Sequence, residues 1–151
     1  MTFQDCYTHA ESIFRMDLKS IHGPKHWHRV EKNAIRMAAR TDGADLTVCR
    51  LFAIYHDSCR INDGSDHEHG PRAAAMLKEY FKNISTMFSF DATRLELLIH
   101  AVEHHTTGGI SDNPTIGACW DADRLDLGRV GITPSSHLMS TAFGKELAIK
   151  N

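Results

Sequence analysis

A histidine and an aspartate stand side by side at the end of the most apolar stretch of the sequence. Residues 51–55 read Leu-Phe-Ala-Ile-Tyr, and His56 and Asp57 follow at once. Burying an imidazole beside a carboxylate without a partner costs several kcal/mol, so the pair needs one. A neutral histidine nitrogen and an ionised carboxylate oxygen are both ligands for divalent transition metals. A metal ion is therefore one candidate partner, and a buried helix with a polar C-terminal cap is the alternative that the dipeptide alone leaves open.

Helical spacing places other histidines and an aspartate on apolar faces. His26 shares a face with Val30, whereas His28 lies roughly 200° round the same helix and is expected to be exposed. His69 also occupies an inward position, and Asp123 lies on an apolar face that Asp121 does not share. Two adjacent histidines, His104 and His105, also stand at the end of an expected helix. The candidate site residues are therefore His26, His56, Asp57, His69, His104, His105 and Asp123.

Each member of this set has an alternative explanation. A lone inward histidine is more often a hydrogen-bonded core residue than a metal ligand, and Asp123 could pair with an arginine. The combination favours a metal site, because several expected helices each bring one or two of these residues close to a helix end. The core of a helical bundle is a usual place for a metal site built from facing helices.

The elements that carry these residues are all expected to be helices. Apolar residues recur at helical spacing over about 3–21, 25–40, 46–57, 68–83, 92–105 and 115–127, and a last helix is expected from 135 or 136 to about 150. Asp45 and Asp91 are expected as N-caps. No strand, repeat or linker is evident. The sequence therefore predicts an all-α fold, one domain spanning residues 1–151 as a bundle of about six to seven helices.

Composition places the chain among ordinary globular proteins. Its 151 residues, 42% of them hydrophobic, suffice for one domain with a real core. The net charge of −2 gives no strong field for nucleic acid or membrane, and no apolar run approaches the ~20 residues of a membrane span. The first residues lack the features of a signal peptide, so we expect a cytoplasmic protein. The four cysteines are scattered, and Cys49 and Cys119 are expected to be buried small residues.

Three segments taken together resemble the HD-domain superfamily of metal-dependent phosphohydrolases, an all-helical fold named for its His-Asp pair. They are His26-x-x-Arg29-Val30, His56-Asp57 and Ala122-Asp123-Arg124-Leu125. The resemblance spans about residues 20–130. It implies that His26, His56, Asp57 and Asp123 are the ligands of one divalent metal ion, which could be Mn, Fe, Co, Ni or Mg.

A second layer resembles the HD-GYP branch of that superfamily. His69 with the following Ala73, Ala74 and Leu77 is similar to one of its segments, and His104-His105 before Gly108-Gly109 is similar to another. The resemblance implies that His69, His104 and His105 hold a second ion, with Asp57 as the bridge. Arg60 occupies the place of a basic residue that follows the His-Asp pair there. The Gly-Tyr-Pro signature is absent, so specificity for cyclic dinucleotides does not carry over.

The resemblance implies hydrolysis of a phosphate ester, most simply a nucleotide or related small molecule, by metal-activated water. Asp57 and Arg60 are the expected catalytic residues, because the planar fork of Arg60 can grip phosphate. Asp63, Arg72 and Arg124 are weaker candidates for the same pocket. Two alternatives stay open: an HD-type di-iron oxygenase, whose ligands would be the same, and a metal-binding module without catalysis. A homodimer is also left open.

Overall fold

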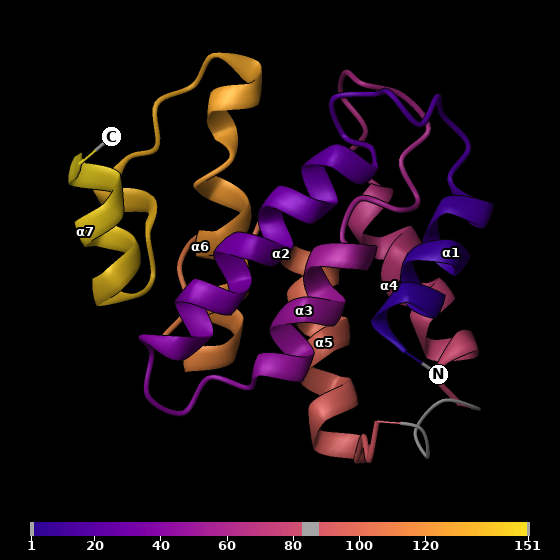
Figure 1. Cartoon of the computed structure of the whole chain (residues 1–151), viewed down its shortest axis with the longest axis horizontal. Helices are drawn as coiled ribbons and strands as arrows, with labels where there is room; N and C mark the ends of the chain where they lie inside the picture. The colour runs from indigo at the N-terminus through magenta and orange to yellow at the C-terminus, as the bar shows by residue number, and fades with distance from the viewer. Residues whose placement is uncertain (1, 83–87, 151) are drawn as a thin grey trace.

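The computed structural model describes residues 2–82 and 88–150, which form seven α-helices, two 3-10 turns and no strand (Figure 1). The α-helices are α1 (Phe3–Ile13), α2 (Pro24–Ala39), α3 (Leu46–Tyr55), α4 (His69–Tyr80), α5 (Ala92–His104), α6 (Pro114–Arg124) and α7 (Ala142–Lys150). The 3-10 turns η1 (Leu127–Val130) and η2 (Ser136–Leu138) lie between α6 and α7. The prediction of an all-α bundle is confirmed.

Helix α3 lies at the centre of the bundle. Seven of its ten residues are buried, and it contacts α1, α2, α5 and α6. A helix that is apolar nearly all round must be enclosed by other elements, and here α1 and α4 lie on one side and α6 on the other (Figure 1). Because α3 is enclosed, the residues that follow its C-terminus are also held inside the protein.

Polar side chains define where several helices begin. The carboxylates of Asp45 and Asp91 accept hydrogen bonds from backbone N–H groups three residues on, at 2.9 and 2.8 Å, and so cap α3 and α5. Asn113 caps α6 in the same way, with Pro114 in the first helical position. The N-caps expected at Asp45 and Asp91 are confirmed.

The first helix is shorter than its apolar spacing predicts, because α1 ends at Ile13 rather than near residue 21. The Asp17 carboxylate accepts a hydrogen bond from the backbone N–H of Lys19 at 2.7 Å, a local bond that favours a turn over a helix. Further turns lead to Gly23, and α2 then starts at Pro24. As a consequence, His22 lies in a turn outside both helices.

The last helix begins at Ala142 and not at residue 135 or 136, where only the short turn η2 forms. The buried carboxylate of Asp121 explains this difference. It accepts hydrogen bonds from the backbone N–H groups of Ser140 and Thr141 at 2.7 and 2.8 Å, which holds these two residues outside the helix. The hydroxyl of Thr141 then accepts from the N–H of Gly144 at 2.9 Å and starts the helix.

Among the described residues, none of the helices has both the length and the apolar character required to cross a lipid bilayer.

Candidate metal centre

Histidine and aspartate side chains from five helices meet at one place in the core. The N-terminal ends of α2 and α4 and the C-terminal ends of α3, α5 and α6 contribute them. Six of the seven residues predicted from the sequence meet here: His26, His56, Asp57, His69, His105 and Asp123. Five of the six are at most 5% exposed. The side chain of Asp123 is 16% exposed and so gives the cluster an edge toward solvent.

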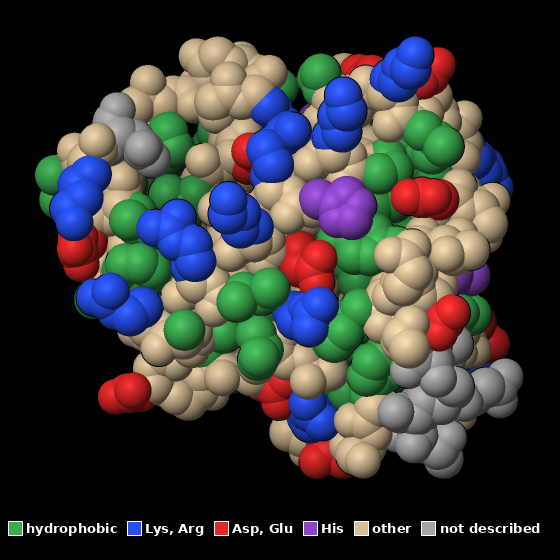
Figure 2. Space-filling model, in the orientation of Figure 1, with side chains coloured by type: hydrophobic (Ala, Val, Ile, Leu, Met, Phe, Trp, Pro, Cys, Tyr) green, Lys and Arg blue, Asp and Glu red, His purple; other side chains and the backbone are tan. Residues whose placement is uncertain are grey.

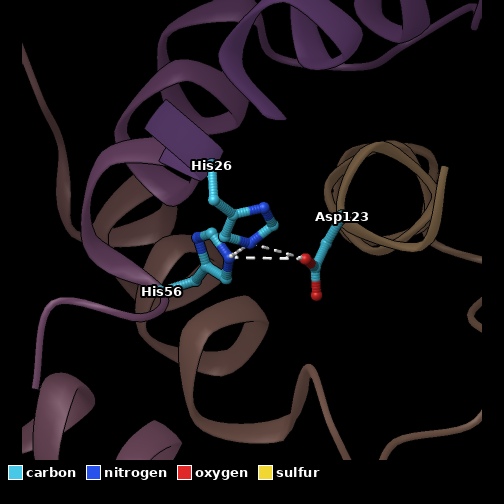
Figure 3. A group of neighbouring side chains, drawn as sticks. All are labelled: His26, His56 and Asp123. Carbon is cyan, nitrogen blue, oxygen red and sulfur yellow. Dashed lines mark hydrogen bonds and ion pairs between the residues drawn. The ribbon is translucent and has the colours of Figure 1, made fainter. Parts of the chain in front are cut away.

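The first group consists of His26, His56 and Asp123, which point toward one another (Figure 3). The Nε2 atoms of the two histidines lie 3.0 Å apart. Oδ1 of Asp123 lies 3.2 Å from Nε2 of His26 and 3.4 Å from Nε2 of His56. Oδ2 of Asp57 completes this group, at 3.4 and 3.5 Å from the same two nitrogens.

The second group consists of Asp57, His69 and His105. Nε2 of His69 lies 2.9 Å from Nε2 of His105, and these two atoms lie 3.2 and 3.5 Å from Oδ1 of Asp57. The two oxygens of Asp57 therefore face different groups, Oδ2 the first and Oδ1 the second. This arrangement lets one carboxylate bridge two neighbouring positions.

The outer nitrogen of each imidazole is already engaged by an oxygen atom. In the first group, Nδ1 of His26 lies 2.6 Å from the carboxylate of Asp126, and Nδ1 of His56 lies 3.0 Å from the carbonyl of Ala53. In the second, the carbonyls of Asp66 and Val102 take the same role for His69 and His105, at 2.5 and 2.7 Å. These oxygens accept hydrogen bonds, so each Nδ1 atom donates its proton outward and each Nε2 atom faces the cluster, where it can bind a metal ion after losing any proton it carries.

The spacing of the inner atoms fits ligands of a common ion. Two ligand atoms each about 2.1 Å from one ion lie about 3.0 Å apart at a right angle and about 3.4 Å apart at the tetrahedral angle. The first group shows 3.0, 3.2 and 3.4 Å. Oδ1 of Asp123 is buried and makes no hydrogen bond despite these short distances. Its neighbours lie at the spacing of fellow ligands, and the residues present fit a divalent metal ion.

The charges of the cluster also favour a cation. Burial would raise the pKa values of Asp57 and Asp123, but the neighbouring histidines, His56 first, hold both well below their usual range. Burial would lower the pKa of His26, yet the carboxylates around it raise that pKa to about 10. Two facing Nε2 atoms can share either a proton or a metal ion, so a metal that binds here displaces protons.

A family model of the HD domain matches residues 25–129, more than half of the chain, and spans all six clustered residues. The chain belongs to the HD domain family. No curated protein and no solved structure matches it. The resemblance to the superfamily is thereby confirmed, whereas the closer resemblance to the HD-GYP branch stays a prediction.

The cluster of this HD domain does not include His104, which the sequence had placed with His105. The side chain of His104 is 42% exposed, and its ring lies against that of His100, with 4.7 Å between ring centroids. The buried face of α5 carries Leu98 and Val102, and His105 continues it by helical spacing. Adjacent helical side chains diverge by about 100°, so His104 points away from the core.

His22 belongs to the cluster although the sequence did not single it out as a site residue. It is 7% exposed, and its Nδ1 atom lies 3.3 Å from Oδ2 of Asp57 without making a hydrogen bond. Helical spacing could not place it, because it lies in the turn before α2. Asp126 was missed although the helix expected over 115–127 included it; in the structure it follows the end of α6. Its position three residues after Asp123 was the available signal.

A cavity of about 270 Å³ reaches the second group and Asp123 from solvent. Its lining residues are Asp57, Arg60, His69, His105, Thr106, Asp123, Arg124, Leu127, Arg129 and Leu138. Two of the weaker candidates lie elsewhere: Asp63 accepts a hydrogen bond from Ser20, and Arg72 pairs with Asp66. Arg60 and Arg124 do line the cavity, together with Arg129, which the sequence analysis did not single out.

Proposed function

We propose that this HD-domain protein is a metal-dependent phosphohydrolase that acts on a phosphate ester of a small molecule, such as a nucleotide. One observation carries the proposal. Two groups of His and Asp side chains, joined by Asp57, lie at a cavity that three arginines line. Carboxylate and imidazole ligands suit divalent cations, and guanidinium groups suit phosphoryl oxygens.

The chain's own residues would hold one or two divalent ions in this arrangement. His26, His56, Asp57 and Asp123 would hold the first, and His69 and His105 would hold a second with Asp57 between them. The hydrogen bonds that the four Nδ1 atoms donate keep each Nε2 atom directed inward. A divalent cation bound there lowers the pKa of a water molecule and polarises a phosphoryl oxygen.

The walls of the cavity suit an anionic substrate of modest size. Arg60, Arg124 and Arg129 supply three positive charges, whereas the lining carboxylates are those of the cluster itself. Leu127 and Leu138 offer apolar surface to the organic part of a substrate. A cavity of about 270 Å³ is near the lower limit of small-molecule pockets, which favours a small phosphate ester over a polymer.

Metal analysis together with a hydrolysis assay tests this function. The protein is purified anaerobically, its metal-to-protein ratio is measured, and phosphate release is followed from nucleoside monophosphates and p-nitrophenyl phosphate with Mn, Co, Ni, Mg or Fe. We expect metal-dependent phosphate release that Asp57→Ala abolishes. The ligand set also suits iron. Two irons per chain, no phosphate release with any metal, and substrate-dependent oxygen consumption would replace the hydrolase with a di-iron oxygenase.

A further inference from the structure

The arginines that line the cavity differ in how much of each guanidinium is already engaged. Arg60 donates from Nε to the carbonyl of Asn62 at 3.1 Å and from Nη2 to the carbonyl of Gly64 at 2.7 Å. Its Nη1 lies 3.4 Å from both ring nitrogens of His69. These contacts fix Arg60 against the second group and leave few of its donors for a ligand.

Arg124 is engaged in a different way. Its Nη1 donates to the carbonyl of Leu138 at 2.7 Å, and its guanidinium lies over the ring of Trp120, 5.7 Å from the centroid. The hydrogen bond ties the end of α6 to η2, and the ring contact holds the side chain along the helix. Arg124 therefore has a structural role that accounts for its position.

Arg129 keeps one edge of its guanidinium without a hydrogen-bond partner. Nη1 donates to the carbonyl of Asp126 at 2.9 Å, while Nη2 lies 4.0 Å from Oδ1 of Asp123 and makes no hydrogen bond with the described residues. Nε is buried and has no hydrogen-bond partner in the part of the chain that the structure describes. The side chain is only 11% exposed. Although Asp123 is near enough to form an ion pair, the Nη2 donors still lack a hydrogen-bond acceptor among the described residues, and a donor left without one is costly.

We propose that Arg129 binds the phosphoryl group of the substrate through its Nη2 group, next to Asp123. The inference rests on the proposed function, because a phosphate ester is the ligand that brings suitable oxygens to this place. The N–H donors of Nη2 suit phosphoryl oxygens, and such charge-assisted hydrogen bonds are among the stronger ones. Arg129, more than Arg60, is then the residue that selects for phosphate.

The chain also fixes Arg129 in place before a ligand arrives. The carboxylate of Asp126 binds Nδ1 of His26 at 2.6 Å and Nε of Arg29 at 2.8 Å, which holds the turn that carries Arg129. The carbonyl of the same Asp126 holds Nη1. The side chain of Asp126 thus orients His26, a predicted metal ligand, and its backbone carbonyl orients the guanidinium of Arg129. Such preorganisation reduces the entropy lost on binding.

Other basic side chains do not take part in the cavity and supply a control. Exposed Lys and Arg residues follow the outer face of α2, where Figure 2 shows a diagonal row of blue side chains. They are Lys25, Arg29, Lys32, Arg36 and Arg40. None of them lines the cavity. Lys32→Met therefore removes one positive charge from the same protein without touching the proposed subsite.

Binding of inorganic phosphate to the metal-loaded protein tests the proposal without requiring turnover. Isothermal titration calorimetry is run on the wild type, Arg129→Met, Arg129→Lys and Lys32→Met, with metal content measured on each preparation. We expect Arg129→Met to weaken phosphate binding by about tenfold or more at unchanged metal content, because it removes charge-assisted hydrogen bonds. Arg129→Lys should recover part of the affinity, and Lys32→Met should bind phosphate as the wild type does.

The outcomes separate this inference from the proposed function. If the wild type binds phosphate in an Arg129-dependent way but hydrolyses no phosphate ester, the function is wrong and the binding subsite stands. Phosphate affinities of Arg129→Met and Arg129→Lys within twofold of the wild type would overturn the inference, as would a metal-loaded wild type that binds no phosphate. A purely structural Arg129 would lower the unfolding temperature of Arg129→Met and leave its phosphate affinity intact. Arg129→Lys keeps the test decisive if Arg129→Met does not fold.

Discussion

The two groups of predicted metal ligands are joined by Asp57 but differ in the residues behind them. In the first group, Asp123 adds a second carboxylate and Asp126 binds the outer nitrogen of His26. In the second, Asp57 is the only carboxylate, and backbone carbonyls bind the outer nitrogens of His69 and His105. The guanidinium of Arg60 also lies 3.4 Å from His69, where its positive charge opposes a cation.

This difference leads us to expect unequal affinities. A carboxylate behind a ligating histidine raises the basicity of its inner nitrogen, and a carboxylate ligand contributes charge that an imidazole does not. The first group has both, so it should bind an ion more tightly than the second. The second ion should be the one that is lost on dialysis and regained with added metal.

Removing the carboxylate of Asp57, which the two groups share, should have the largest effect on metal binding. Asp57→Ala takes one oxygen from each group, so we expect both ions to be lost, with a metal-to-protein ratio near zero after dialysis. Asp63→Ala is the matched control, because that carboxylate lies in the neighbouring loop and outside the cluster. Circular dichroism checks that both variants are folded. A folded Asp57→Ala protein with full metal content would refute the central assignment.

Substitution of one histidine in the second group should remove one ion only. We expect His105→Ala to lower the metal stoichiometry by one while the first ion stays, because His26, His56, Asp57 and Asp123 remain. His104→Ala is the control on the adjacent residue and should keep both ions, since its side chain points away from the cluster. Metal content and kinetics measured on the same preparation show whether His105 binds the second ion. Unchanged stoichiometry with impaired kinetics would mean that His105 contacts the substrate above a single ion.

Asp126, whose carboxylate binds the outer nitrogen of His26, offers a more selective test of the expected difference in metal affinity. Asp126→Asn keeps the size of the side chain and removes its charge, so we expect affinity for the first ion to fall by about 10–100-fold, with the second ion less affected. A two-step metal titration followed by calorimetry resolves the two sites. Equal weakening of both steps, or none, would show that the carboxylate behind His26 is not what distinguishes the groups.

Helical spacing predicted those parts of the cluster that lie on helices. His26 is buried and His28 exposed, as their positions on one helix require. The same rule could have separated His105 from His104, because Leu98, Val102 and His105 follow the buried face of α5. Both histidines were instead predicted as ligands from the family resemblance, which does not state which of two neighbours points inward.

His22, Asp126 and Arg129 lie outside the α-helices in the structure and were not predicted as site residues. His22 lies in a turn whose path depends on local side-chain bonds such as that of Asp17 to Lys19. Asp126 and Arg129 lie after the end of α6, in or next to η1. The role of Asp126 arises from its contact with His26, which is 100 positions away in the sequence. Contacts of this kind follow from the packing of α2 against α6, which a single sequence does not specify.

The smallest expected effect concerns a carboxylate that supports the site only by holding α3. Asp45 caps α3 and pairs with Arg94 at 2.7 Å. Burial acts to raise the pKa of Asp45, but the bonds to Arg94 and to the backbone N–H of Val48 lower it. Removing the cap with Asp45→Ala should lower the free energy of unfolding by about 0.5–2 kcal/mol. Asp45→Asn should cost less, because asparagine still caps and only the ion pair, worth about 0.2–1 kcal/mol, is lost.

The pH dependence of this difference follows from the lowered pKa. A depressed folded-state pKa contributes stability that is fully present above the unfolded value and is lost as pH falls through the folded value. The gap between the wild type and Asp45→Asn should therefore be largest near pH 7 and should shrink toward about pH 3. Urea unfolding in the presence of a chelator measures the gap, with the exposed Asp42→Asn as control. Metal stoichiometry should not change, since Asp45 lies at the opposite end of α3 from His56 and Asp57. A loss of bound metal in Asp45→Asn would show that α3 transmits strain along its length to the cluster.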